Sequence, residues 1–174
     1  MGTIKNSKPV KLIAGLIYPR GIPGFMERVE GELAKAFGSI DGRSPEMEFN
    51  MTDYYGPEMG QGLMRRWVSF SRLPDTENLG GIKIKSNEIE EKYAKEGKRT
   101  VNIDPGYIND SRLVLFSTKD FSHRIYTGNG IYSEVTLIYR KGAFRDLEWT
   151  YPDYRTPRAK EFFTAVRERY LHQI

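Results

Sequence analysis

The chain has 174 residues, of which 39% are hydrophobic and 13% aromatic, enough apolar side chains for the core of one compact domain. It contains no cysteine, which excludes disulfides, thiolate metal sites and a cysteine nucleophile. Its 27 basic and 23 acidic residues are dispersed, so the net charge of +4 is more typical of a solvated surface than of a patch that binds RNA or another anion, which stays the alternative.

The first third of the chain predicts a buried strand followed by an amphipathic helix. Residues 10–18 form a short apolar run that ends at Pro19 and Gly21. The run is shorter than the roughly 20 residues that a membrane span needs, and no leader cleavage site follows it. We therefore expect one domain over residues 1–174, a cytoplasmic location and no membrane association. Apolar residues then recur every fourth position between Phe25 and Phe37, which predicts a helix that ends at Gly38.

The middle of the chain predicts two strands and a second helix. Residues 47–51 alternate between apolar and polar, and residues 63–73 predict a second strand antiparallel to them. Residues 75–96 favour a helix in spite of Gly80 and Gly81. A capping box at Asn87 would restart that helix if it were interrupted.

The second half predicts four strands and a final helix. The strands cover residues 98–104, 113–118, 131–140 and 143–149, with tight turns at residues 128–130 and 141–142. Thr156 is a good helix cap with Pro157 in the first helical position. The order predicts an α+β fold, a split βαβ (ferredoxin-like, β-α-β-β-α-β) sandwich extended by further antiparallel strands and a C-terminal helix.

An Asp-Pro-Gly-Tyr segment, residues 104–107, follows the strand predicted over residues 98–104. Pro and Gly suit the centre of a type II turn. Asp104 then either bonds the backbone of that turn or presents a carboxylate at the end of a strand, where metal ligands and general bases are often found. The sequence leaves both interpretations open.

A second acidic segment, Tyr-Pro-Asp-Tyr at residues 151–154, precedes the final helix. Asp153 either belongs to a connection that fixes this helix or contributes to a site. Glu134 lies in a predicted strand on the same face as Tyr132 and Thr136, so it is either exposed to solvent or part of a polar pocket.

His123 is one of two histidines, and basic and polar side chains surround it in the sequence. Lys119 and Arg124 beside a histidine could bind an oxyanion such as phosphate, and the histidine could transfer a proton near neutral pH. The established nucleotide and metal motifs, such as the P-loop and the H-E-x-x-H zinc motif, do not occur in the sequence.

Three segments resemble an uncharacterised prokaryotic family, domain of unknown function 4416. They are residues 52–60, residues 101–107 with the DPGY motif, and residues 149–154 with the YPDY motif. The resemblance covers nearly the whole chain. It implies a bacterial or archaeal protein and assigns no catalytic residues.

The first hypothesis is an enzyme or ligand-binding domain that acts on a phosphorylated or otherwise anionic small molecule or a nucleotide. Three groups of residues carry it. The catalytic candidates are Asp104, His123 and Asp153. The candidates for a divalent metal such as Mg²⁺ are Asp104, Glu134 and Asp153. The substrate-binding candidates are Lys119, Arg124, Tyr107, Tyr54 and Tyr55.

Two alternatives remain open. An RNA-binding accessory domain would stack bases on exposed tyrosines, namely Tyr107, Tyr126, Tyr132 and Tyr139. A non-catalytic interaction protein would use its aromatic-rich second half as a dimer face. The sequence does not decide whether the protein is an enzyme, and it does not predict the oligomeric state.

Overall fold

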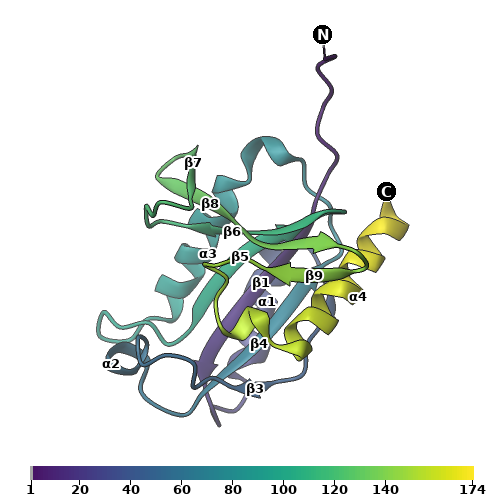
Figure 1. The fold of residues 1–174 in the computed structure, drawn as a ribbon. Helices are drawn as coiled ribbons and strands as arrows, with labels where there is room; N and C mark the ends of the chain where they lie inside the picture. Colours follow the sequence, from purple (N-terminus) through teal and green to yellow (C-terminus); the bar gives the residue numbers. More distant parts are fainter. Residues whose placement is uncertain (1) are drawn as a thin grey trace.

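A computed structural model describes residues 2–174, except for the side chain of Asn78. Within these residues, nine strands form one antiparallel open sheet (Figure 1). The strands are β1 (Lys11–Pro19), β2 (Ile40–Arg43), β3 (Met47–Glu48), β4 (Leu63–Phe70), β5 (Asn102–Ile108), β6 (Arg112–Ser117), β7 (Ile125–Gly128), β8 (Ile131–Arg140) and β9 (Ala143–Asp146). Their order is β2-β4-β1-β5-β6-β8-β7, with β3 added beside β4 and β9 beside β8.

Four α-helices and two short 3₁₀ helices connect or cover the strands in the described part of the chain. They are α1 (Phe25–Phe37), α2 (Gly56–Met59), η1 (Thr76–Asn78), α3 (Gly80–Tyr93), η2 (Asp153–Arg155) and α4 (Pro157–Gln173). None of the helices described within residues 2–174 is long and apolar enough to cross a membrane.

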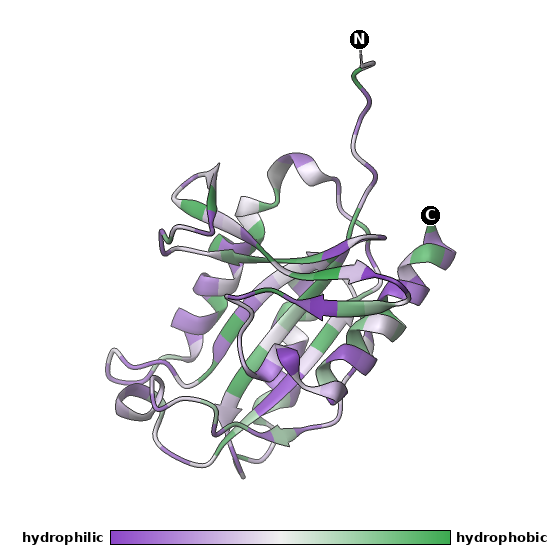
Figure 2. Cartoon of the chain, in the orientation of Figure 1, coloured by the Kyte–Doolittle hydropathy of each residue, from purple (hydrophilic) through white to green (hydrophobic). Residues whose placement is uncertain are grey.

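The two faces of the sheet carry separate hydrophobic clusters. Because side chains alternate along a strand, Leu12 and Leu16 of β1 pack toward α1 and α3, whereas Ile13 packs toward α4. Helix α4 closes its own face with Phe163 and Val166, which are fully buried. Hydrophobic residues accordingly concentrate along the central strands (Figure 2).

The predicted α+β class is confirmed, and so are the C-terminal helix and the additional antiparallel strands. Strand β1 and helix α1 lie within a residue of their predicted limits. Thr156 caps α4, since its side chain accepts a hydrogen bond from the backbone N–H of Ala159. The finer ferredoxin-like assignment stays a prediction.

Two predicted elements in the middle of the chain are corrected. The strand expected at residues 47–51 is reduced to the two residues of β3, and the longer partner of β4 on this side is β2. The helix expected over residues 75–96 begins with η1 and continues as α3. Gly80 and Gly81 lie in its first turn, where a glycine interrupts less than in the interior, and the helix runs unbroken past Asn87.

The turn predicted around Pro105 and Gly106 is wrong, because both residues lie inside β5. A Cβ on Gly106 would come within 2.2 Å of the Val114 carbonyl oxygen, so glycine is required here for close approach of β6. Pro105 pairs with Ala14 of β1, and pairing with β6 begins only at Gly106. The missing N–H of proline is tolerated where the strand has a free side.

Strand β6 lies within a residue of its predicted limits, whereas β5 covers residues 102–108 instead of the predicted 98–104. Strand β8 matches residues 131–140, and the turn at Lys141 and Gly142 joins it to β9 with positive φ at both residues. Strand β9 ends at Asp146 instead of residue 149. The short edge strand β7 was not predicted, and it forms a hairpin with β8.

Candidate functional site

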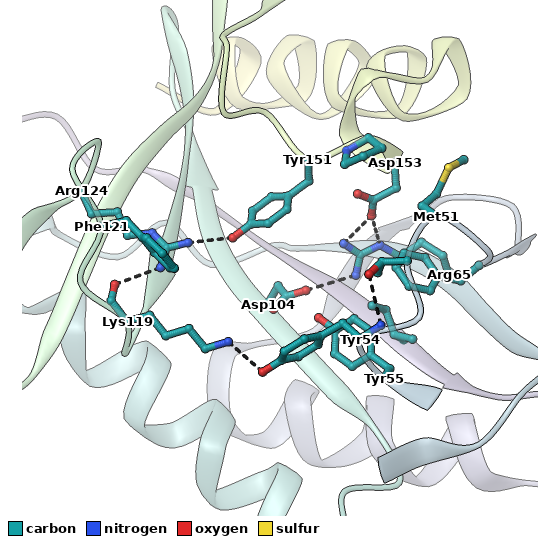
Figure 3. A pocket seen from close by; sticks show the side chains of 14 residues that line it. Met51, Tyr54, Tyr55, Arg65, Asp104, Lys119, Phe121, Arg124, Tyr151 and Asp153 are labelled. Carbon is teal, nitrogen blue, oxygen red and sulfur yellow. Dashed lines mark hydrogen bonds and ion pairs between the residues drawn. The ribbon is translucent and has the colours of Figure 1, made fainter. Parts of the chain in front are cut away.

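A cavity of about 530 Å³ opens on the α4 face of the sheet, beside the start of α4 (Figure 3). We call it the aromatic compartment, because its lining is mostly apolar and includes four aromatic rings in addition to Tyr54. Its walls come from six parts of the chain: β1, the segment between β3 and β4, β4, β5, the β6–β7 loop and the segment that leads into η2. Its lining residues are Ile17, Phe49, Met51, Thr52, Tyr54, Tyr55, Arg65, Asp104, Lys119, Phe121, Arg124, Tyr151, Pro152 and Asp153.

A second cavity of about 180 Å³, the polar compartment, adjoins the first. The two share six lining residues, which are Tyr54, Tyr55, Asp104, Lys119, Arg124 and Tyr151. The polar compartment adds the side chains of Lys83, Arg99, Asn102, Leu115, Phe116, Ser117, Thr118 and Glu134. A molecule that reaches both compartments would therefore contact both an apolar and a strongly polar surface.

Arg65 is a buried cation on the wall of the aromatic compartment. It projects from β4, its Nε donates a hydrogen bond to Oδ2 of Asp153 at 2.7 Å, and its Nη2 forms an ion pair with the same oxygen at 2.7 Å. Its Nη1 lies 3.3 Å from Asp104. Burial alone would lower the pKa of Arg65, but the negative charges of Asp153 and Asp104 help to outweigh it and raise that pKa. Arg65 is therefore a permanent, internally neutralised charge.

Gly15 makes room for this guanidinium. In the register of the sheet, Gly15 of β1 lies between Trp67 of β4 and Asp104 of β5. A Cβ at this position would lie 2.7 Å from the Tyr154 hydroxyl oxygen and 2.9 Å from Nη1 of Arg65. The absence of a side chain on β1 thus lets Arg65 reach across the strand toward Asp104.

Asp104 lies on β5 and faces the cavity, in the wall that both compartments share. Its side chain keeps 30% of its surface exposed, and its contact with Arg65 is the longest ion pair of that cluster. Tyr107 is three residues further along the same strand and therefore faces the other side of the sheet, where it packs against Phe116. The structure consequently separates Tyr107 from the other predicted binding residues.

Lys119 lies at the entrance, in the β6–β7 loop. Its Nζ donates a hydrogen bond to the Tyr54 hydroxyl oxygen at 2.8 Å and lies 4.5 Å from the centre of that ring. Within the described residues, Lys119 makes no ion pair with a carboxylate. The hydrogen bond from Lys119 lowers the pKa of Tyr54, because the ammonium group favours the phenolate.

Arg124 is held by a carboxylate of the sheet. Its Nε donates to Oε2 of Glu134 at 2.7 Å. Its Nη2 donates to the Tyr151 hydroxyl oxygen at 2.8 Å (Figure 3). Burial, followed by the charge of Glu134, raises the pKa of Tyr151 to about 12. The same carboxylate oxygen of Glu134 lies 3.1 Å from Nε2 of His123. Glu134 is buried, as expected for the polar-pocket interpretation.

His123 packs away from both compartments. Its ring stacks between Phe121 and Trp149, with ring centres 6.0 and 5.1 Å apart. It contacts the site through Glu134 and does not line either cavity. His123 therefore contacts residues of the cavity walls, Phe121 and Glu134, and lies outside both linings.

Arg99 and Asn102 form the far wall of the polar compartment. Arg99 is bound through its Nη2 to Glu58 of α2 at 2.6 Å, and its Nη1 donates to Oδ1 of Asn102 at 2.7 Å. The hydrogen bond to Glu58 raises the pKa of Arg99. The Nδ2 atom of Asn102 is buried and has no hydrogen-bond partner among the described residues.

The predicted metal grouping is not the arrangement found. Among residues 2–174, no group of three or more His, Asp or Glu side chains is placed to hold a metal ion. Asp104 and Asp153 both contact Arg65, and Glu134 contacts Arg124. Each predicted metal ligand thus has a cationic side chain as its neighbour.

The structure gathers most of the predicted site around one cavity. Six of the predicted residues line the aromatic compartment: Asp104, Asp153, Lys119, Arg124, Tyr54 and Tyr55. Glu134 joins them in the polar compartment, and His123 and Tyr107 line neither. The prediction missed Arg65, Arg99 and Asn102. For Arg65, the sequence does contain an indication: it lies two residues before Trp67 in an apolar strand, so the two side chains share a face of the sheet.

The tyrosines proposed as an RNA surface do not share one face. Tyr107 packs toward α3, whereas Tyr139 packs against Phe144 on the α4 face and carries Arg167 over its ring at 3.6 Å. Tyr126 is exposed on the edge strand β7 beside Ile125. The alternative of an interaction surface stays a prediction.

The fold and site together define an α+β protein with an open antiparallel sheet and a charged, aromatic-lined double cavity beside its C-terminal helix. A family model described as Domain of unknown function (DUF4416) matches residues 8–170, so the chain belongs to this family, as the sequence resemblance indicated. No curated protein and no solved structure matches the chain.

Proposed function

We propose that this protein binds a small organic molecule with an anionic group, a phosphate or a carboxylate, in the two adjoining compartments. The observation that carries the proposal is Lys119, a cation at the junction of both compartments with a tyrosine hydroxyl as its hydrogen-bond partner. The other cations of the site differ from it. Arg65, Lys83, Arg99 and Arg124 each form an ion pair with a carboxylate.

This difference decides which charge is free to meet a ligand. A cation that is already paired offers little additional attraction to an anion, because its charge is neutralised locally. Lys119 can exchange the neutral Tyr54 hydroxyl for an anionic oxygen and gains a charge-assisted hydrogen bond in doing so. Arg124 and Arg99 then supply fixed donors on the wall behind it.

Asp104 supplies a hydrogen-bond acceptor, in contrast to the cationic donors of the site. Its carboxylate is partly exposed at the boundary between the compartments and would accept a hydrogen bond from a hydroxyl or amino group of the ligand. The aromatic compartment has the volume of a typical small-molecule site, which ranges from about 300 to 1,000 Å³. The ligand would therefore be a small polar metabolite with an apolar portion.

The test is a thermal-shift and calorimetric screen of sugar phosphates, nucleotides and dicarboxylates, each beside an uncharged analogue. We expect at least one anion to bind, and Lys119→Met to weaken that binding about ten- to a hundredfold, since a hydrogen bond to a charged group contributes about 1.5–3 kcal/mol. The matched control is Lys95→Met, which removes the same charge from an exposed position outside both compartments. Equal affinities for both variants, or no binding by any anion in the screen, would contradict the proposal.

A further inference from the structure

The polar compartment contains a hydrogen-bond donor that the protein itself does not use. Asn102 is 3% exposed, and its Nδ2 has no partner among the described residues. A buried donor without a partner costs about 1–3 kcal/mol, so such a group usually meets a ligand or an ordered water. Asn102 lines the polar compartment, where such a partner would lie.

The hydrogen bond from Arg99 fixes the orientation of the Asn102 side-chain amide. Because Arg99 can only donate, the atom of Asn102 that it contacts at 2.7 Å must be the carbonyl oxygen Oδ1. Arg99 is in turn held by three hydrogen bonds to Glu58. The hydrogen bonds from Glu58 through Arg99 to Oδ1 leave Nδ2 as the donor without a partner, and exchanging the two amide atoms would place two donors against each other.

The two compartments differ in what they accommodate. The polar compartment, about 180 Å³, combines the Asn102 donor with Lys119 and has room for one small anionic group. The aromatic compartment, about 530 Å³, carries Tyr54, Phe121 and Tyr151 at its rim, all three partly exposed. Exposed aromatic faces of this kind bind flat rings by stacking.

We propose that the polar compartment is an oxyanion site formed by Asn102 and Lys119, and that the site as a whole selects molecules joining a planar heterocycle to a single phosphate, such as nucleoside monophosphates. This inference rests on the proposed binding function and narrows its ligand class. The planar ring lies in the aromatic compartment, and the phosphate receives the Nδ2 donor and the Lys119 ammonium. Asp104, at the boundary, accepts a hydrogen bond from a sugar hydroxyl or an exocyclic amino group.

The small volume of the polar compartment sets the number of phosphates. A triphosphate has to extend two further charged groups out of this volume, past the carboxylate of Asp104 at the boundary between the compartments. We therefore expect adenosine monophosphate to bind more tightly than adenosine triphosphate, adenosine or inorganic phosphate.

The experiment is isothermal titration calorimetry of the full chain with adenosine, cytidine, guanosine and uridine monophosphates. The comparison ligands are the corresponding nucleosides, adenosine triphosphate, inorganic phosphate and glucose 6-phosphate. We expect at least one monophosphate to bind about tenfold or more tightly than its nucleoside and than phosphate alone. Asn102→Asp replaces the donor by a charged acceptor of the same shape, and we expect it to weaken the monophosphate about tenfold or more while the nucleoside is unaffected. Asn102→Ala tests the loss of the donor without a new charge, and circular dichroism checks that each variant is folded.

The outcomes separate this inference from the proposal on which it rests. If glucose 6-phosphate or another non-aromatic anion binds in a Lys119-dependent way and the monophosphates do not, the anion site stands and the selection of a heterocycle is overturned. If a monophosphate binds equally to wild type, Asn102→Asp and Asn102→Ala, the donor serves an ordered water and the role of Asn102 is overturned. If no anion binds, both proposals fail.

Discussion

Arg65 and Lys119 line the same cavity but differ in how their charges are neutralised. Arg65 is buried and forms ion pairs with two carboxylates, Asp153 and Asp104. Lys119 lies at the entrance and donates to the hydroxyl of Tyr54. The charge of Arg65 is neutralised by carboxylates of the protein, whereas the ammonium group of Lys119 can still form an ion pair with an anionic ligand. Proximity to a cavity therefore does not by itself identify a binding residue.

Arg65 and Lys119 differ in this way because removing a charge from water costs free energy. A buried guanidinium has to be matched by carboxylates in the same low-dielectric region, and the match fixes the positions of three elements, β4, β5 and η2. A half-exposed ammonium keeps part of its hydration and loses little when its partner is exchanged. We therefore expect substitutions around Arg65 to change stability and substitutions around Lys119 to change ligand binding.

The largest expected effect is that of Asp153→Asn. The substitution keeps the shape of the side chain and removes the carboxylate that accepts a hydrogen bond from Nε of Arg65 and forms an ion pair with its Nη2. A buried charge that loses its partner typically costs about 3–5 kcal/mol, so we expect a decrease of that size in the free energy of unfolding, measured by urea denaturation.

Asp104→Asn is the matched control for that substitution. Asp104 is 30% exposed and contacts the same guanidinium at 3.3 Å, so its loss should cost about 1 kcal/mol or less. Equal losses for the two variants would show that both carboxylates neutralise Arg65 to the same extent, and the distinction between a structural and a ligand-facing acid would be lost.

An intermediate effect is expected for Gly15→Ala. The new methyl group would overlap the Tyr154 hydroxyl and Arg65, both buried and unable to withdraw into solvent. Overpacking of this kind costs about 1–3 kcal/mol. Gly31→Ala is the control, because a Cβ at that position in α1 meets no atom within 4 Å, and helix propensity should add up to about 1 kcal/mol of stability. Thermal unfolding of both variants should give shifts of opposite sign.

The smallest expected effect is the titration of Tyr54. Lys119 lowers the pKa of Tyr54, whereas burial raises the pKa of Tyr151 to about 12, so Tyr54 should ionise first as the pH rises. The folded protein then releases the Tyr54 proton at a lower pH than the unfolded chain. The interaction therefore adds stability only in the alkaline range and none near neutral pH. Ultraviolet absorbance of tyrosinate should show this first step in the wild type, and Lys119→Met should move it to higher pH.

Much of the fold could be predicted from sequence patterns within single short segments. The apolar run of β1, the four-residue spacing of α1 and the Thr156 cap of α4 each reflect local preferences that the tertiary structure keeps. The sequence predicts Lys119 and Arg124 as candidate site residues because they flank a histidine, and Asp153 because it is an acid between two tyrosines ahead of the final helix. Their convergence on one cavity was a reasonable hypothesis, and the structure shows it.

The DPGY segment shows where local reasoning fails. Pro105 and Gly106 favour a turn when read alone, yet the sheet extends β5 through them. Once the segment is a strand, alternation places Asp104 on the cavity side and Tyr107 on the opposite side. One error in secondary structure thus misplaced one predicted binding residue.

By itself, the sequence determined the α+β class, the family, most element limits and the composition of the polar cluster, because each depends on short-range periodicity or on residue type. Only the tertiary structure decided which charges are neutralised inside the protein. Arg65 is adjacent in the sequence to neither of its carboxylates, and it reaches Asp104 across β1 through the space that Gly15 leaves. Ion pairing depends on distance in three dimensions, so the contrast between Arg65 and Lys119 exists only once the sheet is formed.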